Sequence, residues 1–175
     1  MIDSSVTTHL RKYFELACSR FEDGDYALAT FFAITLIEEC AKILILRDAD
    51  LQSKDERQRA VDHSEKHWTA LVNLLSSSEE FDTLPKRWRD ETWSLFDPES
   101  KKATQLRNNS LYLRFDRRGH LTTPDQLITA ERAALLVYLS GFVAHELEEY
   151  VDIEKGWAQA ILQRAEDFRA RHLKS

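Results

Sequence analysis

Glycine and proline are scarce in this chain, which has only 4 glycines and 3 prolines among its 175 residues. A fold with many β-strands needs far more of these residues at its turns, so the composition argues against one. Long segments instead carry apolar residues with a period close to 3.6, which is typical of amphipathic helices. The sequence therefore predicts an all-α fold of six or seven helices, arranged as an antiparallel up-down bundle with an added C-terminal helix.

Cysteines and long uncharged apolar runs are also few. The two cysteines, Cys18 and Cys40, both fall in apolar helical stretches. We interpret them as buried free thiols of a cytoplasmic protein, with a disulfide between the first two helices as the alternative. No stretch of about 20 apolar residues is free of charge, and residues 1–5 lack the basic start and apolar run of a signal peptide. We therefore expect a cytoplasmic protein without a membrane span.

Positively charged residues are fewer than negatively charged ones. The chain has 24 Lys and Arg and 30 Asp and Glu, which gives a formal net charge of −6. This balance argues against a protein that coats nucleic acid unspecifically, although it leaves room for one local basic cleft. Hydrophobic residues make up 43% of the chain and charged residues 31%, which is typical of a globular protein. The length favours one domain over residues 1–175.

The apolar pattern and the capping residues divide the chain into helical segments. Gly24 and Asp25 predict a tight turn and an N-cap between the first two helices, and Thr129 predicts the N-cap of a late helix. Residues 48–60 are polar and predict a loop or a frayed extension, and residues 113–120 predict an extended excursion that closes near 122–124. The predicted helices cover 4–22, 25–47, 62–77, 82–96, 97–112 and 129–149, with a polar continuation over 150–172.

The stretch 25–47 is apolar on nearly every helical face, which is typical of a central, buried helix. Glu38, Glu39 and Lys42 interrupt it. At 3.6 residues per turn, Glu38 and Lys42 share one face and Glu39 lies beside them. A charge on a buried helix needs a partner or a cleft. Two interpretations stay open here: an ion pair on a solvent-facing strip, or a polar site set into the helical core.

A second polar segment reverses the overall charge of the chain. Between residues 101 and 118 there are six basic residues and one acidic residue, Asp116. Arginine offers forked donors that fit phosphate, and the interleaved Tyr112, Phe115 and His120 could stack on bases. The alternative is a solvated loop whose cations favour a helix C-terminus. The basic residues are Lys101, Lys102, Arg107, Arg114, Arg117 and Arg118.

His63 and His67 lie four residues apart and so share a helix face. This spacing can bind a metal, but no glutamate directly follows His63, so the motif of zinc proteases is absent. We predict no metal site and no cofactor. A histidine that gives or takes a proton near the centre of the helix 25–47 is one interpretation. A pair of helix-start histidines with no chemistry is the other.

The order of these features resembles the AbiV-type abortive-infection family, bacterial phage-defence proteins within the HEPN-like superfamily. The features are the stretch ALATFFAITLIEECAK, the helix start at His63–His67, the segment from Arg107 to Tyr112 with its extended tail, and the helix opening over 124–131. The resemblance covers about residues 8–145. It implies a HEPN-like helical bundle, a homodimer with its active site at the dimer cleft, and a metal-independent ribonuclease. Such sites combine an Arg, a polar residue and a His four to six positions after the Arg.

Arg107 and Asn108 match the first two positions of that pattern, but Tyr112 stands five residues after Arg107, and the expected His is missing. Metal-free RNA cleavage needs a base, an acid and a cation for the charge that develops on phosphorus. Arg107 suits the charge. A phenol, with a pKa of about 10, is a poor base at neutral pH, although Tyr112 could donate a proton or position the phosphate. The base would then come from His67, His63 or Glu39 beside Lys42.

Three hypotheses follow from these patterns. The first is a toxin-like ribonuclease of phage defence. The second is a non-catalytic HEPN-like module that binds RNA or a protein partner, such as a phage product or a neutralising protein, and so blocks translation or senses infection. The third is a plain structural bundle in which Glu38, Glu39 and Lys42 only form ion pairs. Under any of these hypotheses, the core or an interface could hold Trp88, Trp93 and Trp157. For the ribonuclease, the predicted catalytic residues are Arg107, Asn108, Tyr112, Glu38, Glu39, Lys42 and His67, and the predicted RNA contacts are Arg114, Arg117, Arg118, Lys101 and Lys102.

Overall fold

The computed structural model of the chain describes residues 3–48, 54–115, 120–153 and 156–173. The all-α prediction is confirmed, since the only strands among these residues are two short ones in a hairpin. The elements are α1 (Ser4–Glu22), α2 (Tyr26–Asp48), α3 (Lys54–Val61), α4 (His63–Thr69), a π-helical turn η1 (Ala70–Leu75), α5 (Glu79–Asp82), α6 (Lys86–Phe96), α7 (Lys102–Asn109), β1 (Arg114–Phe115), β2 (Leu121–Thr122), α8 (Pro124–Leu127), α9 (Ala130–Tyr150) and α10 (Gln159–His172).

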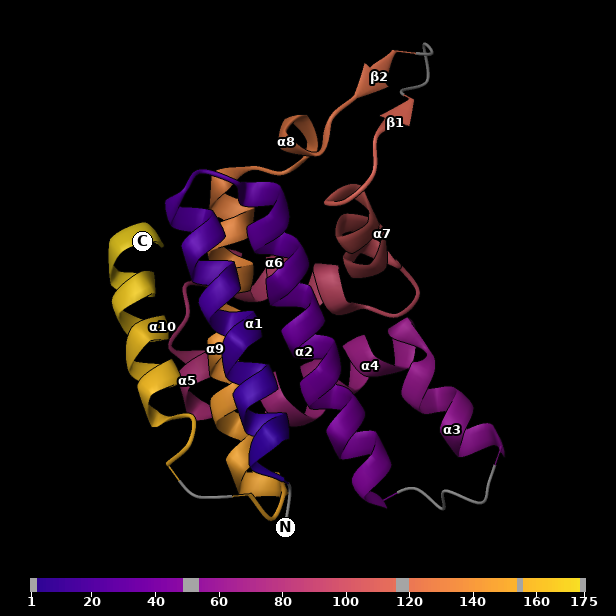
Figure 1. Cartoon of the computed structure of the whole chain (residues 1–175), viewed down its shortest axis with the longest axis vertical. Coiled ribbons are helices and arrows are strands. Elements are labelled where there is room, and N and C mark those ends of the chain that lie inside the picture. Colours follow the sequence, from indigo (N-terminus) through magenta and orange to yellow (C-terminus); the bar gives the residue numbers. More distant parts are fainter. Residues whose placement is uncertain (1–2, 49–53, 116–119, 154–155, 174–175) are drawn as a thin grey trace.

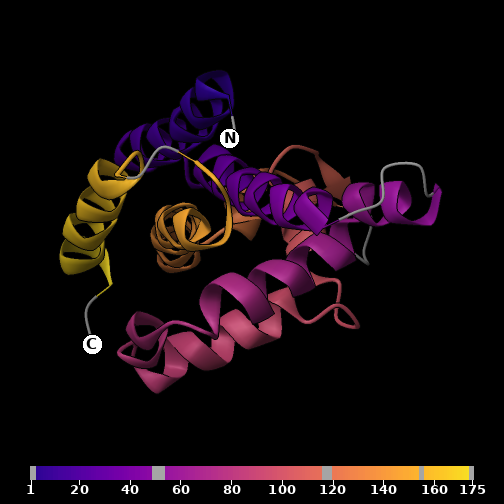
Figure 2. The same ribbon diagram turned by 90° about the horizontal axis from the view of Figure 1, so that it is seen from below.

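Four long helices, α1, α2, α9 and α10, run along the long axis of the molecule (Figure 1). Helix α9 packs against α1, α2, α10 and η1. Figure 2 shows α9 nearly end-on, enclosed by these neighbours. Its sequence explains this position, because apolar residues occupy all of its faces and 13 of its 21 residues are buried. A helix that is apolar all round is stable only inside the protein, so α9 forms the centre of the core together with α2.

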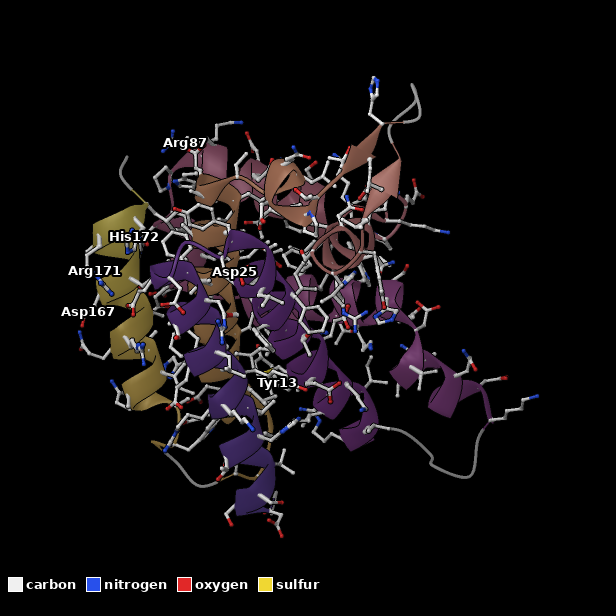
Figure 3. The ribbon with its side chains drawn as sticks, turned by 45° about the horizontal axis from the view of Figure 1, so that its top comes forward. Tyr13, Asp25, Arg87, Asp167, Arg171 and His172 are labelled. Carbon is white, nitrogen blue, oxygen red and sulfur yellow. The ribbon has the colours of Figure 1, made fainter. Side chains whose placement is uncertain are left out.

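The predicted boundaries of α1, α2 and α9 are confirmed within a residue or two. Gly24 has a φ of 80°, which suits a glycine in the turn after α1. The carboxylate of Asp25, labelled in Figure 3, accepts a hydrogen bond of 3.0 Å from the backbone N–H of Leu28 and so caps α2. The hydroxyl of Thr129 accepts one of 3.2 Å from the N–H of Arg132. These local caps explain why the boundaries could be predicted from sequence.

Other boundaries were predicted wrongly. Residues 54–61 form a separate helix, α3, where a loop or a frayed extension was predicted over 48–60. The helix expected over 62–77 changes to the π-helical turn η1 at Ala70. The helix expected to begin at Asp97 begins at Lys102, because Lys101 adopts a left-handed backbone with φ of 52°. The continuation over 150–172 is interrupted as well, since α10 begins only at Gln159. These shorter segments explain why the described residues form more helices than the six or seven predicted.

The hairpin of β1 and β2 extends away from the bundle (Figure 1), with Arg114 opposite Thr122 and Phe115 opposite Leu121. This confirms the extended excursion predicted after α7. The expected RNA contacts Arg117 and Arg118 lie outside the described residues. Helices α4 and α7 lie beside α2 in Figure 1, and both pack against it. That arrangement brings three distant parts of the sequence together around the middle of α2.

Both cysteines are free and buried, so the disulfide alternative is wrong and the buried thiols are confirmed. Trp88 and Trp157 are 6% and 5% exposed and belong to the core, whereas Trp93 is 42% exposed. Of the helices formed by the described residues, none combines the length and the apolar character that a membrane span requires.

Gly141 lies where α9 packs against Phe14 of α1 and Ala165 of α10. A Cβ built on Gly141 would lie 2.6 Å from Cε2 of Phe14 and 2.8 Å from Cβ of Ala165. We expect Gly141→Ala to lower the free energy of unfolding by about 1–3 kcal/mol through overpacking, although alanine is the better helix former. Urea unfolding at neutral pH measures this change. The exposed Glu149→Ala in the same helix is the control and should stay within about 0.5 kcal/mol of the parent; an equally small effect of Gly141→Ala would contradict the close packing.

Candidate functional site

Glu38 lies in the middle of α2 and is 2% exposed. Its Oε1 lies 2.9 Å from Nε2 of His67 and 2.9 Å from Nδ1 of His63. Its Oε2 lies 3.6 Å from Nζ of Lys66 and 3.6 Å from Nε of Arg107. We call these five residues the Glu38 cluster. One buried carboxylate thus meets four basic side chains from two other helices.

The cluster follows from local sequence on each helix. His63, Lys66 and His67 have the spacing i, i+3, i+4, which places them on one face of α4. Asp62 fixes the start of α4, because its carboxylate accepts hydrogen bonds from the backbone N–H groups of Ser64 and Glu65. The polar face of α4 is turned toward α2, against which α4 packs. The buried Ala103 and Leu106 anchor α7 and so position Arg107.

The carboxyl group of Glu38 is held ionised by its neighbours. Burial would raise its pKa, but the hydrogen bond from His67 and the positive charges of His67, His63 and Lys66 outweigh burial and lower the pKa. An ionised carboxylate accepts hydrogen bonds, so His67 donates from Nε2–H to Oε1 over 2.9 Å. His67 is 2% exposed and also packs edge-on against the ring of Phe96, with the ring centroids 5.6 Å apart. Its tautomer and orientation are therefore fixed.

His63 and Arg107 are the accessible members of the cluster. Their side chains are 38% and 24% exposed, against 7% for Lys66. Nδ1 of His63 and Nε of Arg107 are buried and, despite their proximity to Glu38, make no hydrogen bond of proper geometry. The guanidinium of Arg107 stacks over the ring of Phe31 at 5.3 Å. Even without any charge on the histidines, Lys66 and Arg107 exceed the charge of Glu38 by one unit, so the site favours an anion at its open side.

The other predicted site residues lie apart from this cluster. Lys42 does not share a site with Glu38, because its Nζ binds Oε2 of Glu39 at 3.2 Å, and both side chains are about one-third exposed. This pair lines a groove beside His9 of α1. A helix position is 100° from the next, so Glu38 and Glu39 face different neighbours. The sequence interpretation that grouped all three charges was wrong in this respect.

Asn108 is exposed near the end of α7, and Tyr112 is 63% exposed in the turn that follows. Lys101 and Lys102 are exposed at the start of α7, where the ammonium of Lys102 donates to the hydroxyl of Ser94. The structure places Arg114 in β1. Sequence reasoning missed Lys66 and treated His63 only as an alternative. The i, i+3, i+4 spacing on α4 was the signal that could have found both.

No three His, Cys, Asp or Glu side chains among the described residues form a group that could hold a metal ion. Lys66 and Arg107 also place two fixed positive charges beside Glu38, and these oppose the binding of a cation. The donor set of the cluster suits proton transfer and anion binding instead.

A family model described as AbiV, of the HEPN type, matches residues 4–145. The chain belongs to the AbiV family. All five residues of the Glu38 cluster lie within the matched region of this AbiV-family protein, and so does the hairpin that follows α7, whereas α10 lies beyond it. Membership supports a function of the abortive-infection, HEPN type. Neither a search of curated proteins nor one of solved structures found a match.

Proposed function

We propose that this AbiV-family protein is a metal-independent endoribonuclease, which acts in the cytoplasm as a toxin-like effector of phage defence. The observation that carries the proposal is the contact of Arg107 and His63 with the buried carboxylate of Glu38. This contact supplies a histidine beside the Arg-Asn pair, although Tyr112 occupies the position where the HEPN pattern has its histidine. His63 comes from α4 instead of the segment after α7.

The cluster supplies the base and the cation that RNA cleavage needs, and Tyr112, which lies outside the cluster, supplies the acid. His63 takes the proton of a 2′-hydroxyl, and the 2′-oxygen then attacks the adjacent phosphorus. The guanidinium of Arg107 stabilises the negative charge that develops on the phosphoryl oxygens. The bond from phosphorus to the 5′-oxygen breaks, and Tyr112 gives a proton to the leaving oxygen. Glu38 is a positioning residue: it orients His63 and stabilises the imidazolium that forms.

The remaining polar residues extend the site. Lys101, Lys102, Arg114, Arg117 and Arg118 would bind the phosphates of the RNA on both sides of the cleaved bond. The HEPN resemblance supports a homodimer that forms one cleft from two copies, with residues 1–175 as one domain. Glu39 and Lys42 bind each other away from Arg107, so we assign them no step in the reaction.

A second candidate is a non-catalytic module that binds RNA, a phage product or a neutralising protein. The observation in its favour is Tyr112, which is 63% exposed and replaces the histidine of the HEPN pattern. This module would keep the anion site at Arg107 without a complete set of proton-transfer groups.

Cleavage of total bacterial RNA by the purified protein in EDTA tests the proposal. We expect the wild type to cut, and Arg107→Ala to lower the rate by about 10²–10³-fold, because it removes the charge that stabilises the transition state. Lys101→Ala removes a cation from the exposed start of α7 and is the matched control, with an expected loss of less than about tenfold.

Full RNA cleavage by a folded Arg107→Ala protein would contradict the proposal. Intact RNA with the wild type, together with retention of RNA or of a protein partner, would favour the second candidate.

A further inference from the structure

A polar hollow of about 240 Å³ lies between α6, α7 and the start of α9. We call it the α6–α7 pocket. Lys102, Gln105 and Asn109 of α7 line it, and their spacing of three and four residues places them on one face of the helix. The Glu38 cluster does not use any of these residues.

Asn109 is the feature that points to a ligand. Its Oδ1 is buried and has no hydrogen-bond partner. A buried acceptor without a partner is unfavourable, and such groups in native proteins are usually satisfied by a water or a ligand. The amide of Asn109 combines this acceptor with two donors, and the amide of Gln105 adds a second set of the same kind. The pair is suited to a ligand that carries donors and acceptors side by side.

The walls of the pocket combine apolar surface with polar and charged groups. Leu95 and Leu106, which are 3% and 6% exposed, supply apolar surface. Arg132 donates from Nε to Oε1 of Glu91 at 2.9 Å, and its Nη2 lies 2.8 Å from the same oxygen. The guanidinium is thus already paired with Glu91, and the ammonium of Lys102 donates to the hydroxyl of Ser94. A nucleobase has apolar faces and a polar edge, so it matches both features.

The surface of α7 connects this pocket to Arg107. Successive residues of a helix are 100° apart, so Arg107 and Asn109 are about 200° apart, with the exposed Asn108 between them. Helix α7 contains no acidic residue. A strand that lies across Asn108 therefore reaches Arg107 on one side and the α6–α7 pocket on the other without meeting a carboxylate of α7.

We propose that the α6–α7 pocket binds an unpaired nucleobase of the same RNA strand whose phosphate lies at Arg107. This proposal rests on the proposed function and adds base selectivity to it, with Asn109 and Gln105 as the residues that read the base edge. A free nucleotide offers the same base chemistry, so the experiment must separate the two sources.

Binding of labelled single-stranded oligonucleotides measures the selectivity. Four 2′-O-methyl oligomers, each with one type of base, are titrated in EDTA and followed by fluorescence anisotropy. We expect the wild type to bind the best oligomer at least about tenfold more tightly than the worst, because a mismatched base leaves polar groups unpaired. Asn109→Leu should reduce this range to about twofold. Asn109→Asp keeps the shape but replaces a donor by a charged acceptor. It should weaken the binding of all four oligomers through charge repulsion and also change their order of preference.

Two controls distinguish the pocket from the phosphate site. Arg107→Ala should weaken binding of all four oligomers by a similar factor, and the exposed Asn73→Leu in η1 should change nothing. Each variant is used only if its thermal unfolding is cooperative. An unchanged preference in both Asn109 variants, with binding still lost in Arg107→Ala, would overturn the base pocket and leave the proposed function intact.

The last experiment measures the Tm of the protein with free nucleoside monophosphates. If no oligomer binds the wild type, the proposed function fails with the base pocket. In that case, a nucleoside monophosphate that raises the Tm of the wild type but not of Asn109→Leu would assign the pocket to a free nucleotide. An oligomer preference that Asn109→Leu abolishes, without a Tm shift from the monophosphates, supports the RNA strand.

Discussion

Glu38→Ala is expected to lower the free energy of unfolding by about 3–5 kcal/mol, because it removes the counter-charge of a buried group. Lys66 is 5% exposed and His67 is 2% exposed. Both contact the carboxylate of Glu38, and the substitution would leave them buried without it. Glu38→Gln keeps the volume of the side chain but not its charge, so it should lose most of the same free energy. Urea unfolding at pH 7, with the m-value compared between variants, measures the change.

The effect of Glu38 on stability should depend on pH. Its pKa is lowered in the folded protein, so its ionised form stabilises the fold above the unfolded value of 4.5. That contribution is lost as the pH falls through the folded pKa. The difference between the wild type and Glu38→Gln should therefore be full at pH 7 and shrink below pH 4.5.

Glu39→Gln is the matched control, since Glu39 is the next residue and pairs with Lys42 at the surface. Such a pair contributes less than about 1 kcal/mol. If Glu38→Gln and Glu39→Gln lower the free energy of unfolding by similar amounts at pH 7, the buried carboxylate of Glu38 does not have the stabilising role that we assign to it.

His63→Ala is expected to lower kcat for RNA cleavage by about 10²–10⁴-fold, the usual contribution of a general base. Its side chain is 38% exposed, so it can reach a substrate, and its Nδ1 lies 2.9 Å from the carboxylate of Glu38. The loss should appear in kcat more than in KM. The pH profile of kcat should change as well, because a general base acts only in its deprotonated form.

His9→Ala is the control for this prediction, because His9 is exposed on α1 beside Lys42 and not at the Glu38 cluster. It should leave kcat unchanged. If His63→Ala stays active while a folded His67→Ala loses activity and its pH dependence, the base is His67 and the assignment to His63 is wrong.

The long helices could be predicted because their signals are local. Asp25 and Thr129 cap α2 and α9 with their own side chains, and the apolar pattern shows how deeply both helices are buried. The late start of α7 could not be predicted, since Asp97 and Pro98 look like a helix start and only the backbone of Lys101 reveals the interruption. Likewise, no sequence pattern predicts the π-helical turn that directly follows α4.

The candidate site was predicted only in part, for a similar reason. Glu38, His67 and Arg107 were each identified as polar residues in unusual surroundings, but their meeting depends on how α4 and α7 pack against α2. Lys42 appeared to be the partner of Glu38 because it lies one turn away on the same helix. The 2.9 Å contact of Glu38 with His67 spans 29 residues of sequence, and pairings of that range are not encoded in a local pattern.

The order of the Glu38 cluster along the chain also bears on when a nascent protein acquires its site. Its carboxylate is translated first, its histidines next and Arg107 last. Helix α2 is buried by α1 on one side and by α9 on another, and α9 ends at Tyr150. Because domains fold as units during synthesis, we expect the cluster to assemble only after Tyr150 has emerged from the ribosome. A cell that makes such a protein is thus exposed to an assembled site only after the whole of α9 has been translated.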